Sequence, residues 1–588
     1  MPSLSSLLIV LGLVLLASSA SAASGKKPTD RSREYAWVTS ESFASWRSIL
    51  QNSLLGREQA STGDSTCSVC KLAIGTLKTM LALPFTSTST LAGLGENICN
   101  QLQIFATPKG CKGVIDAYAD QVFYILKRTK YSAGLLCNLL TGLQCEEDET
   151  VLHWNVPLPA VPRPPLPDIR PPAADAKKLR VLHLTDIHFD LFYQPGSNAH
   201  CTDPQCCQED SGDVVGRAAG EWGDSGKCDV PAHLVDNMFS WIAKNDHFDY
   251  ILMTGDLPDH TIWKQSRAQQ LAVLDMTVEY LKRHFPNTPV YPVVGNHESA
   301  PCNTFPPPNV GGSNTIGWLY DALADAWKDW LPQDALRTVT AGAYYRINPY
   351  PGLRIISLNN NYCYNMNFFL LMNTTDPNGQ LAWLINELQA AETAGDAVHI
   401  IGHLPPGSGD CMRTWTDNYL KIVARYQGTI RAQFYGHEHK DNVHLYFDPD
   451  FPNRATGAVY VGPSVTTYTG QNPGFRVYTI DGDYAGSSWA VLDHETYIAN
   501  ITAANLQPEV GPVWYKEYSA KEAFGLEQLE PRNWNALLDE FERDDAKFQT
   551  FFRYYWKSDD TSVNAGCDAA CRHRMVCHMR PRHPTCAF

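Results

Sequence analysis

Seven side chains of types that bind divalent metal ions lie at the ends of short apolar runs. These runs and the polar residues that close them read VLHLTDIH, ILMTGD, VVGNHE, VHIIGH and AQFYGHEH. The candidate ligands are Asp186, His188, Asp256, Asn296, His403, His437 and His439. Ligands of α/β sheets bind beyond the carboxyl ends of strands, so residues far apart in sequence can meet at one sheet edge. The sequence therefore predicts a single metal site built from five strand ends.

The order D-x-H, G-D, G-N-H-E, G-H and G-H-x-H resembles the signature of calcineurin-like metallophosphoesterases. The resemblance implies an α/β fold, a two-sheet sandwich flanked by helices, with a pair of divalent ions. Two such ions polarise a phosphoryl group and activate water as a nucleophile. By this resemblance one ion is held by Asp186, His188 and His439, the other by Asn296, His403 and His437, and Asp256 bridges them.

The ligand types indicate which metal to expect. Imidazole and carboxylate groups suit zinc, and the neutral amide of Asn296 limits negative charge beside an anionic substrate. Purple acid phosphatases, a related group, have a tyrosine ligand three residues after the aspartate of the second motif. That position is Asp259 here, which disfavours a tyrosinate-bound ferric ion. We expect two zinc ions, with manganese or iron as alternatives.

The leaving alkoxide needs a proton, and histidine is the natural donor under mildly acidic conditions. His297 follows the ligand Asn296, and His260 lies four residues after Asp256. Both are predicted catalytic residues; the alternative for His260 is a loop histidine that binds nothing. His183 and His399 lie inside apolar runs and are expected to be packing or support residues.

Several features of the 588-residue chain indicate export. Residues 1–22 contain a short apolar run and then small residues, which is typical of a cleaved signal peptide. The 17 cysteines are expected to form disulfides in an oxidising compartment, and the odd number leaves one over. Sequons at Asn373 and Asn500 are candidate glycosylation sites. The net charge of −15 argues against a nucleic-acid partner.

Composition divides the remaining chain into four parts. Residues 63–149 hold six cysteines and helical periodicity, and residues 150–177 are a proline-rich linker. Residues 178–500 alternate short strands with longer helical segments, which predicts the α/β unit. Residues 501–588 are aromatic, predicted helical, and end in four cysteines.

This organisation resembles the acid sphingomyelinase family over residues 60–588. The shared segments include VVGNHESAP, TTDPNGQLAWL, HIIGHLPPG, YPGLRIISLN and VLDHETYI. The resemblance makes residues 63–149 a saposin B-type domain and implies cleavage of sphingomyelin to ceramide and phosphocholine, in lysosomes or outside the cell. It also implies the disulfides Cys67–Cys145, Cys70–Cys137, Cys99–Cys111, Cys201–Cys206, Cys207–Cys228, Cys363–Cys411, Cys567–Cys571 and Cys577–Cys586. Cys302 is left unpaired.

The implied partner is a sphingomyelin-containing membrane that a monomeric enzyme binds peripherally, with anionic lipids assisting as histidines protonate in acid. One alternative is a phosphodiesterase for nucleotides or other soluble phosphate esters, whose relatives resemble residues 178 onward without the saposin-type unit. Another is a non-catalytic lipid-binding or lipid-transfer protein. The complete set of metal ligands argues against the second alternative.

Overall fold

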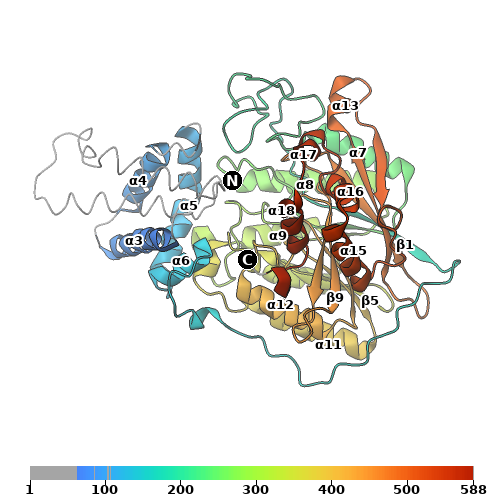
Figure 1. The fold of residues 1–588 in the computed structure, drawn as a ribbon. Helices are drawn as coiled ribbons and strands as arrows, with labels where there is room; N and C mark the ends of the chain where they lie inside the picture. The colour runs from blue at the N-terminus through green and yellow to red at the C-terminus, as the bar shows by residue number, and fades with distance from the viewer. Residues whose placement is uncertain (1–62, 85–86, 102–104, 106–107, 587–588) are drawn as a thin grey trace, which may run out of the picture.

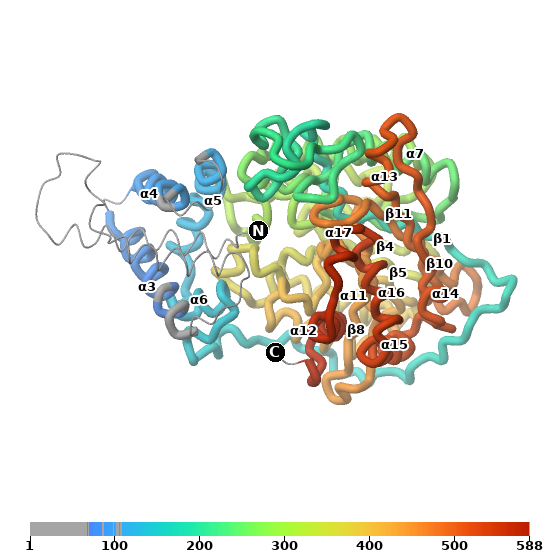
Figure 2. Tube along the Cα trace, turned by 45° about the horizontal axis from the view of Figure 1, so that its top comes forward, coloured from blue at the N-terminus to red at the C-terminus, as the bar shows by residue number. Residues whose placement is uncertain are grey.

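A computed structural model describes residues 63–586, except 85–86, 102–104 and 106–107. The predicted signal peptide, residues 1–22, lies outside the described residues. The early helices form a lobe at one side of a body that contains two sheets, and the last helices lie across the body (Figures 1 and 2). Helices flank the sheets, so the predicted fold class is confirmed.

The first sheet has six strands in the order β12-β11-β10-β1-β2-β3. Its centre is β1, which pairs in parallel with β2 and antiparallel with β10. The segment VLHL of β1 is wholly buried, as expected of a strand covered on both faces. The strands are β1 (Lys178–Leu184), β2 (Tyr250–Met253), β3 (Val290–Pro292), β10 (Gly474–Asp481), β11 (Val491–Ala499) and β12 (Trp514–Ser519).

The second sheet has the order β4-β5-β6-β7-β9-β8. Its inner strands β5, β6, β7 and β9 are parallel, so their carboxyl ends reach the same edge. Phe434 of β7 lies against Tyr478 of β10, with ring centroids 4.8 Å apart, and joins the two sheets in one core. The strands are β4 (Tyr345–Tyr350), β5 (Leu353–Ser357), β6 (Ala397–Ile401), β7 (Ile430–Tyr435), β8 (Asn442–Phe447) and β9 (Ala455–Val461).

Six helices connect these strands and cover the sheets. In α8, Ser266 caps the N-terminus by accepting from Gln269 N, and three basic residues occupy the last turn, where the helix dipole favours positive charge. The helices are α7 (Ala232–Asn245), α8 (Arg267–His284), α9 (Gly317–Ala326), α10 (Gln333–Gly342), α11 (Gln380–Ala394) and α12 (Arg413–Arg425). Short 3-10 helices are η1 (Thr150–Leu152), η2 (Gly312–Asn314), η3 (Asn360–Tyr362), η4 (Phe368–Leu371), η5 (Pro377–Gly379) and η6 (Pro584–Cys586).

The N-terminal lobe consists of α3 (Gly63–Ala82), α4 (Thr88–Gln101), α5 (Pro108–Arg128) and α6 (Ala133–Thr141). Three disulfides hold it: Cys67–Cys145, Cys70–Cys137 and Cys99–Cys111. Its apolar core continues into Phe368 and Phe369 of the body. Tyr118 donates to the carbonyl of Cys302 at 3.1 Å, and Thr129 donates to that of Leu371 at 2.6 Å. The lobe is therefore packed on the body and not merely tethered to it.

The proline-rich linker has no helix or strand beyond η1 and runs along the outside of the body (Figure 1). Val156 N donates to Asn418 of α12 at 2.9 Å, and Arg425 donates to the carbonyl of Val161 at 3.0 Å. Helix α12, through Asn418 in its middle and Arg425 at its C-terminal end, thus holds an otherwise extended segment against the surface.

The C-terminal segment is helical but also contributes β12, which pairs with β11 and extends the first sheet. Because β12 of this C-terminal segment belongs to the first sheet, we expect the segment to fold together with the body. Trp534, Leu537 and Leu538 of α15 are buried in the same core as the strands. The helices are α13 (Ile501–Leu506), α14 (Ala520–Phe524), α15 (Pro531–Arg543), α16 (Asp545–Tyr555), α17 (Asp560–Ala565) and α18 (Ala569–His578).

The other five disulfides lie in the body and the C-terminal segment. They are Cys201–Cys206, Cys207–Cys228, Cys363–Cys411, Cys567–Cys571 and Cys577–Cys586. With the three of the lobe, these are the same eight pairs that the family resemblance implied. Cys302 is buried and free, and its thiol lies 3.2 Å from Asn303 Oδ1.

Candidate dimetal site

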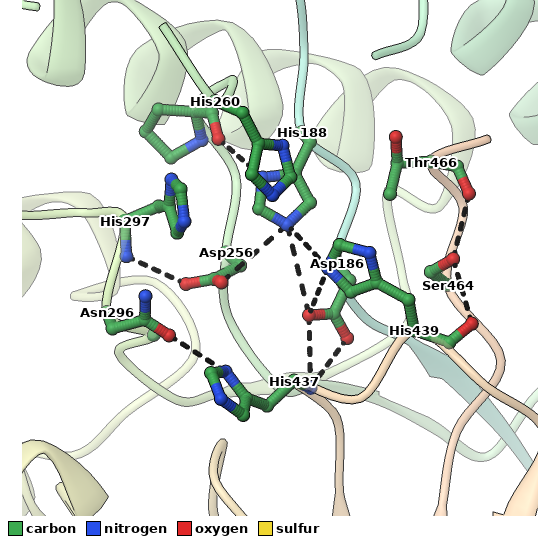
Figure 3. A network of polar contacts seen from close by, with 12 residues as sticks. Asp186, His188, Asp256, His260, Asn296, His297, His437, His439, Ser464 and Thr466 are labelled. Atoms are coloured by element: carbon green, nitrogen blue, oxygen red, sulfur yellow. Dashed lines mark hydrogen bonds and ion pairs between the residues drawn. The ribbon is translucent and has the colours of Figure 1, made fainter. Parts of the chain in front are cut away.

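The seven predicted metal ligands meet at one edge of the two sheets. Asp186 and His188 follow β1, Asp256 follows β2, and Asn296 follows β3. His403 follows β6, and His437 and His439 follow β7. Figure 3 shows six of them, all but His403, directed toward a common centre. Because adjacent parallel strands end at the same edge, the convergence follows from the strand order of both sheets.

One half of the site consists of Asp186, His188 and His439. The Nε2 atoms of the two histidines are 3.1 Å apart, and Asp186 Oδ1 lies 3.4 Å from His439 Nε2 and 3.9 Å from His188 Nε2. Ligands of one tetrahedral zinc ion, with bonds near 2.0–2.1 Å, lie about 3.3 Å from each other. These three atoms therefore fit around a single ion.

The other half consists of Asn296, His403 and His437. Asn296 Oδ1 is 3.0 Å from both His403 Nε2 and His437 Nδ1. Asp256 Oδ2 lies 3.1 Å from His403 Nε2 and 3.6 Å from His188 Nε2, so it faces ligands of both halves. This is the placement that a bridging carboxylate requires.

Backbone carbonyl groups orient three of the histidines. The Nδ1 atoms of His188, His403 and His439 lie 2.7, 2.7 and 2.8 Å from the carbonyl oxygens of Pro258, Thr254 and Tyr468. A ring whose Nδ1–H donates to a carbonyl presents the Nε2 lone pair to a metal. His437 is reversed: its Nδ1 faces the site and its Nε2 lies 3.2 Å from Asp410 Oδ2.

The turns that carry the ligands have unusual backbone conformations. Five ligands have positive φ values between 49° and 69°: Asp186, His188, Asp256, His437 and His439. L-residues rarely adopt this region, and such strain concentrates at functional sites. Ser464, which donates to the carbonyl of His439 at 3.2 Å, helps hold the last of these turns (Figure 3).

The buried charges at the site influence one another strongly. Burial opposes ionisation of His403, yet Asp256 and Asp186 raise the pKa of His403 to about 9. Burial alone would raise the pKa of Asp256, but His403 and His297 hold that pKa well below its usual value. Without metal, His403 therefore holds a proton that a bound cation would displace.

The two predicted proton donors lie beside the ligands but differ in environment. Burial lowers the pKa of His297 to about 4, and its Nδ1 lies 3.1 Å from the carbonyl of Asp259. Burial acts in the same direction on His260, but Asp229, together with Asp256 and Asp259, raises the pKa of His260 above its usual value. His260 Nδ1 is 2.8 Å from Asp229 Oδ2, and its ring stacks on Tyr468 with centroids 4.1 Å apart.

Three supporting acids were not singled out by sequence reasoning. Glu298 accepts from Leu257 N at 2.7 Å and holds the Asp256 turn; its place in the GNHE motif was an available signal. Asp229 and Asp410 belong to no motif, so nothing in the sequence marked them. Asp229 also accepts from Thr466 at 2.7 Å, which fixes the carboxylate facing His260.

The predicted core histidines do lie outside the ligand set. His183 Nε2 lies 2.8 Å from Thr254 Oγ1, and His399 Nε2 lies 2.8 Å from the carbonyl of Trp489. Burial lowers their pKa values to about 3 and about 4, so both rings are neutral packing groups.

Among the described residues, no helix is both long and apolar enough to cross a bilayer.

The two-sheet fold and the Asp, His and Asn donor set define a calcineurin-like phosphoesterase that uses divalent metals. Residues 179–441 match the calcineurin-like phosphoesterase model, and residues 455–582 match the model of the acid sphingomyelin phosphodiesterase C-terminal region.

Comparison with curated proteins extends the match to most of the chain. The sphingomyelin phosphodiesterases of Homo sapiens and Bos taurus are each 43% identical, covering 88% and 87% of this chain and 81% of each relative. The cyclic GMP-AMP phosphodiesterase SMPDL3A of Mus musculus is 32% identical over 67% of this chain and 87% of its own length. The chain belongs to the sphingomyelin phosphodiesterase family and is a phosphoric diester hydrolase.

Proposed function

We propose that this protein hydrolyses sphingomyelin to ceramide and phosphocholine at a pair of zinc ions. The observation that carries the proposal is the full set of seven converging ligands in a chain that is 43% identical to sphingomyelin phosphodiesterases. Asp186, His188 and His439 hold one ion, Asn296, His403 and His437 hold the other, and Asp256 bridges. Zinc fits because every donor is imidazole, carboxylate or amide.

Metal ions held by these seven residues would polarise the phosphoryl group and activate water as the nucleophile. Side chains beside the metal ligands donate the proton that the leaving ceramide alkoxide requires. His260 keeps a proton because Asp229 is bonded to it, and His297 is held by its backbone N–H, which donates to Asp256 Oδ1 at 2.8 Å. We assign proton donation to His260, which Asp229 positions, and assign to His297, which is neutral near pH 5, a catalytic contact with the phosphate.

The N-terminal lobe supports a lipid substrate. Exposing the chains of sphingomyelin to water costs about 0.8 kcal/mol per CH₂, so the enzyme must act at the membrane or on a lifted lipid. Leu72 and Leu83 of this lobe are half-exposed, which suits contact with acyl chains. We infer a monomer that binds membranes peripherally, assisted by anionic lipids in acid.

The proposed domains are 63–149 (saposin B-type), 150–177 (linker), 178–500 (catalytic) and 501–588 (C-terminal). The proposed destination is the lysosome or the extracellular space, after removal of residues 1–22. Of the two sequons, Asn373 is exposed, whereas Asn500 is half-buried and its Oδ1 accepts from Ala503 N at 2.8 Å. Asn373 is therefore the more accessible glycosylation site.

The test is hydrolysis of sphingomyelin liposomes and of nucleotide diesters near pH 5, with and without a chelator. Sphingomyelin hydrolysis that the chelator abolishes and zinc restores is the expected result. Activity on nucleotides alone would overturn the lipid assignment in favour of a soluble diester. Lipid binding without any turnover would support the non-catalytic alternative.

A further inference from the structure

A second group of metal-ligating side chains lies beside the dimetal site and is not part of it. Glu438, His444 and His578 come from three segments: the turn after β7, strand β8 and the last residue of α18. Glu438 Oε1 lies 3.0 Å from His444 Nε2 and 3.1 Å from His578 Nε2. We propose that these residues form a third zinc site, distinct from the catalytic pair.

The two separations between Glu438 and the histidines are those of ligands around one ion, and all three ligand atoms lie within 4.8 Å of one another. Both separations fall in the 3.0–3.4 Å range found between the closest ligand atoms of the dimetal site and match the roughly 3.3 Å expected around tetrahedral zinc. Two histidines and one glutamate also form a recognised zinc donor set that leaves a fourth position open. Asn442 Nδ2 donates to Glu438 Oε2 at 2.9 Å, which orients the carboxylate and leaves Oε1 for the ion.

The surroundings provide a route for the ion. His444 is fully buried, the Glu438 side chain is 10% exposed, and that of His578 is 43% exposed, so the site opens toward solvent on the side of α18. A cavity of about 330 Å³ adjoins it, lined in part by Asn442, Arg574 and His578. Water in this cavity can fill the fourth coordination position.

The position of the site implies a structural role. An ion there links α18, whose following residues are closed by the Cys577–Cys586 disulfide, to the turn that carries His437 and His439. His444 Nδ1 has no hydrogen-bond partner in the described part of the chain, unlike the carbonyl-bonded histidines of the dimetal site. Missing support of this kind weakens metal affinity about 10- to 100-fold, so the third ion binds less tightly than the catalytic pair.

The test is zinc content of the full-length protein after dialysis against a zinc buffer. Wild type is expected to retain one zinc more than His578→Gln, which keeps a hydrogen-bond donor facing Glu438 but does not ligate zinc. His573→Gln changes another half-exposed histidine of α18 and should match wild type. Equal zinc content in wild type and His578→Gln would overturn the proposal, because the cluster would then be a hydrogen-bonded ion pair only.

Two further measurements separate this site from the catalytic one. His403→Ala should lose zinc from the dimetal site yet still differ by one equivalent from the double variant that adds His578→Gln. If His578→Gln does not fold, the proposal is tested by removing zinc from the wild-type protein with increasing concentrations of a chelator. The third site is supported if one equivalent of zinc is lost before activity on a soluble phosphodiester decreases. Zinc loss strictly in step with the loss of activity overturns it.

Discussion

His260 and Asp229 form a buried pair, with His260 Nδ1 3.0 and 2.8 Å from the two oxygens of one carboxylate. Burial acts to lower the pKa of His260, but Asp229, with smaller contributions from Asp256 and Asp259, raises that pKa overall, so the protonated form persists to higher pH. A general acid must be protonated when the leaving oxygen departs. We therefore propose Asp229 as a positioning residue for His260, although Asp229 lies 31 positions earlier in the sequence.

Asp229→Asn should shift the pH dependence of turnover. Removing the carboxylate lowers the pKa of His260, so the alkaline limb of the kcat profile should move to lower pH. His260→Ala should lower kcat about 10²- to 10⁴-fold, the range for loss of a general acid. The measurement is kcat against pH, with the exposed His247→Ala as control. An alkaline limb that stays in place in Asp229→Asn would show that His260 does not supply the proton.

His403→Ala should abolish sphingomyelin hydrolysis and lower bound zinc. Its Nε2 faces both Asn296 Oδ1 and Asp256 Oδ2, so one half of the site loses a ligand and the bridge loses a neighbour. The eight disulfides should still form, because no cysteine belongs to the predicted ligand set. Metal analysis and a turnover assay check this. Full zinc content with no activity would contradict a purely metal-ligating role.

Metal removal should destabilise the protein more as pH rises. In the metal-free protein the pKa of His403, which burial would lower, is raised to about 9 by Asp256. A raised histidine pKa stabilises the fold fully below about pH 6.5, and this contribution is lost as pH climbs to about 9. The zinc-loaded protein has no such proton to lose. Melting temperatures with and without chelator should therefore diverge from pH 6 to pH 9; a constant difference would refute the assignment.

A charge on the exposed face of the N-terminal lobe should impair hydrolysis of membrane lipid selectively. Leu72→Asp places a carboxylate where we expect acyl chains, so liposome hydrolysis should fall several-fold while a soluble analogue is cleaved at the wild-type rate. Asn386→Asp adds the same charge at an exposed position of α11, on the body, and serves as the matched control. Equal losses on both substrates would place the effect on folding and not on membrane contact.

The six cysteines of the N-terminal lobe suggest a separate unit that could be deleted cleanly. Deleting the lobe would, however, also disturb the body. The core of the lobe continues into Phe368 and Phe369, and Tyr118 donates to the carbonyl of Cys302, beside the Asn296 loop. Deleting residues 63–149 would expose this apolar surface and free that loop. Point substitutions on the outer face avoid both effects.

The sequence by itself determined the fold class and the family, and it predicted the seven metal ligands, because these residues occupy short motifs that follow one another in a characteristic order along the chain. His183 and His399 were also separable from the ligands, since they lie within apolar runs. Only the tertiary structure decided which acid supports which histidine, how the lobe packs on the body, and that His578 meets Glu438 across 140 residues. These relationships depend on contacts between distant segments that share no motif. The contacts form when the sheets pair and the helices pack, so no local sequence pattern predicts them.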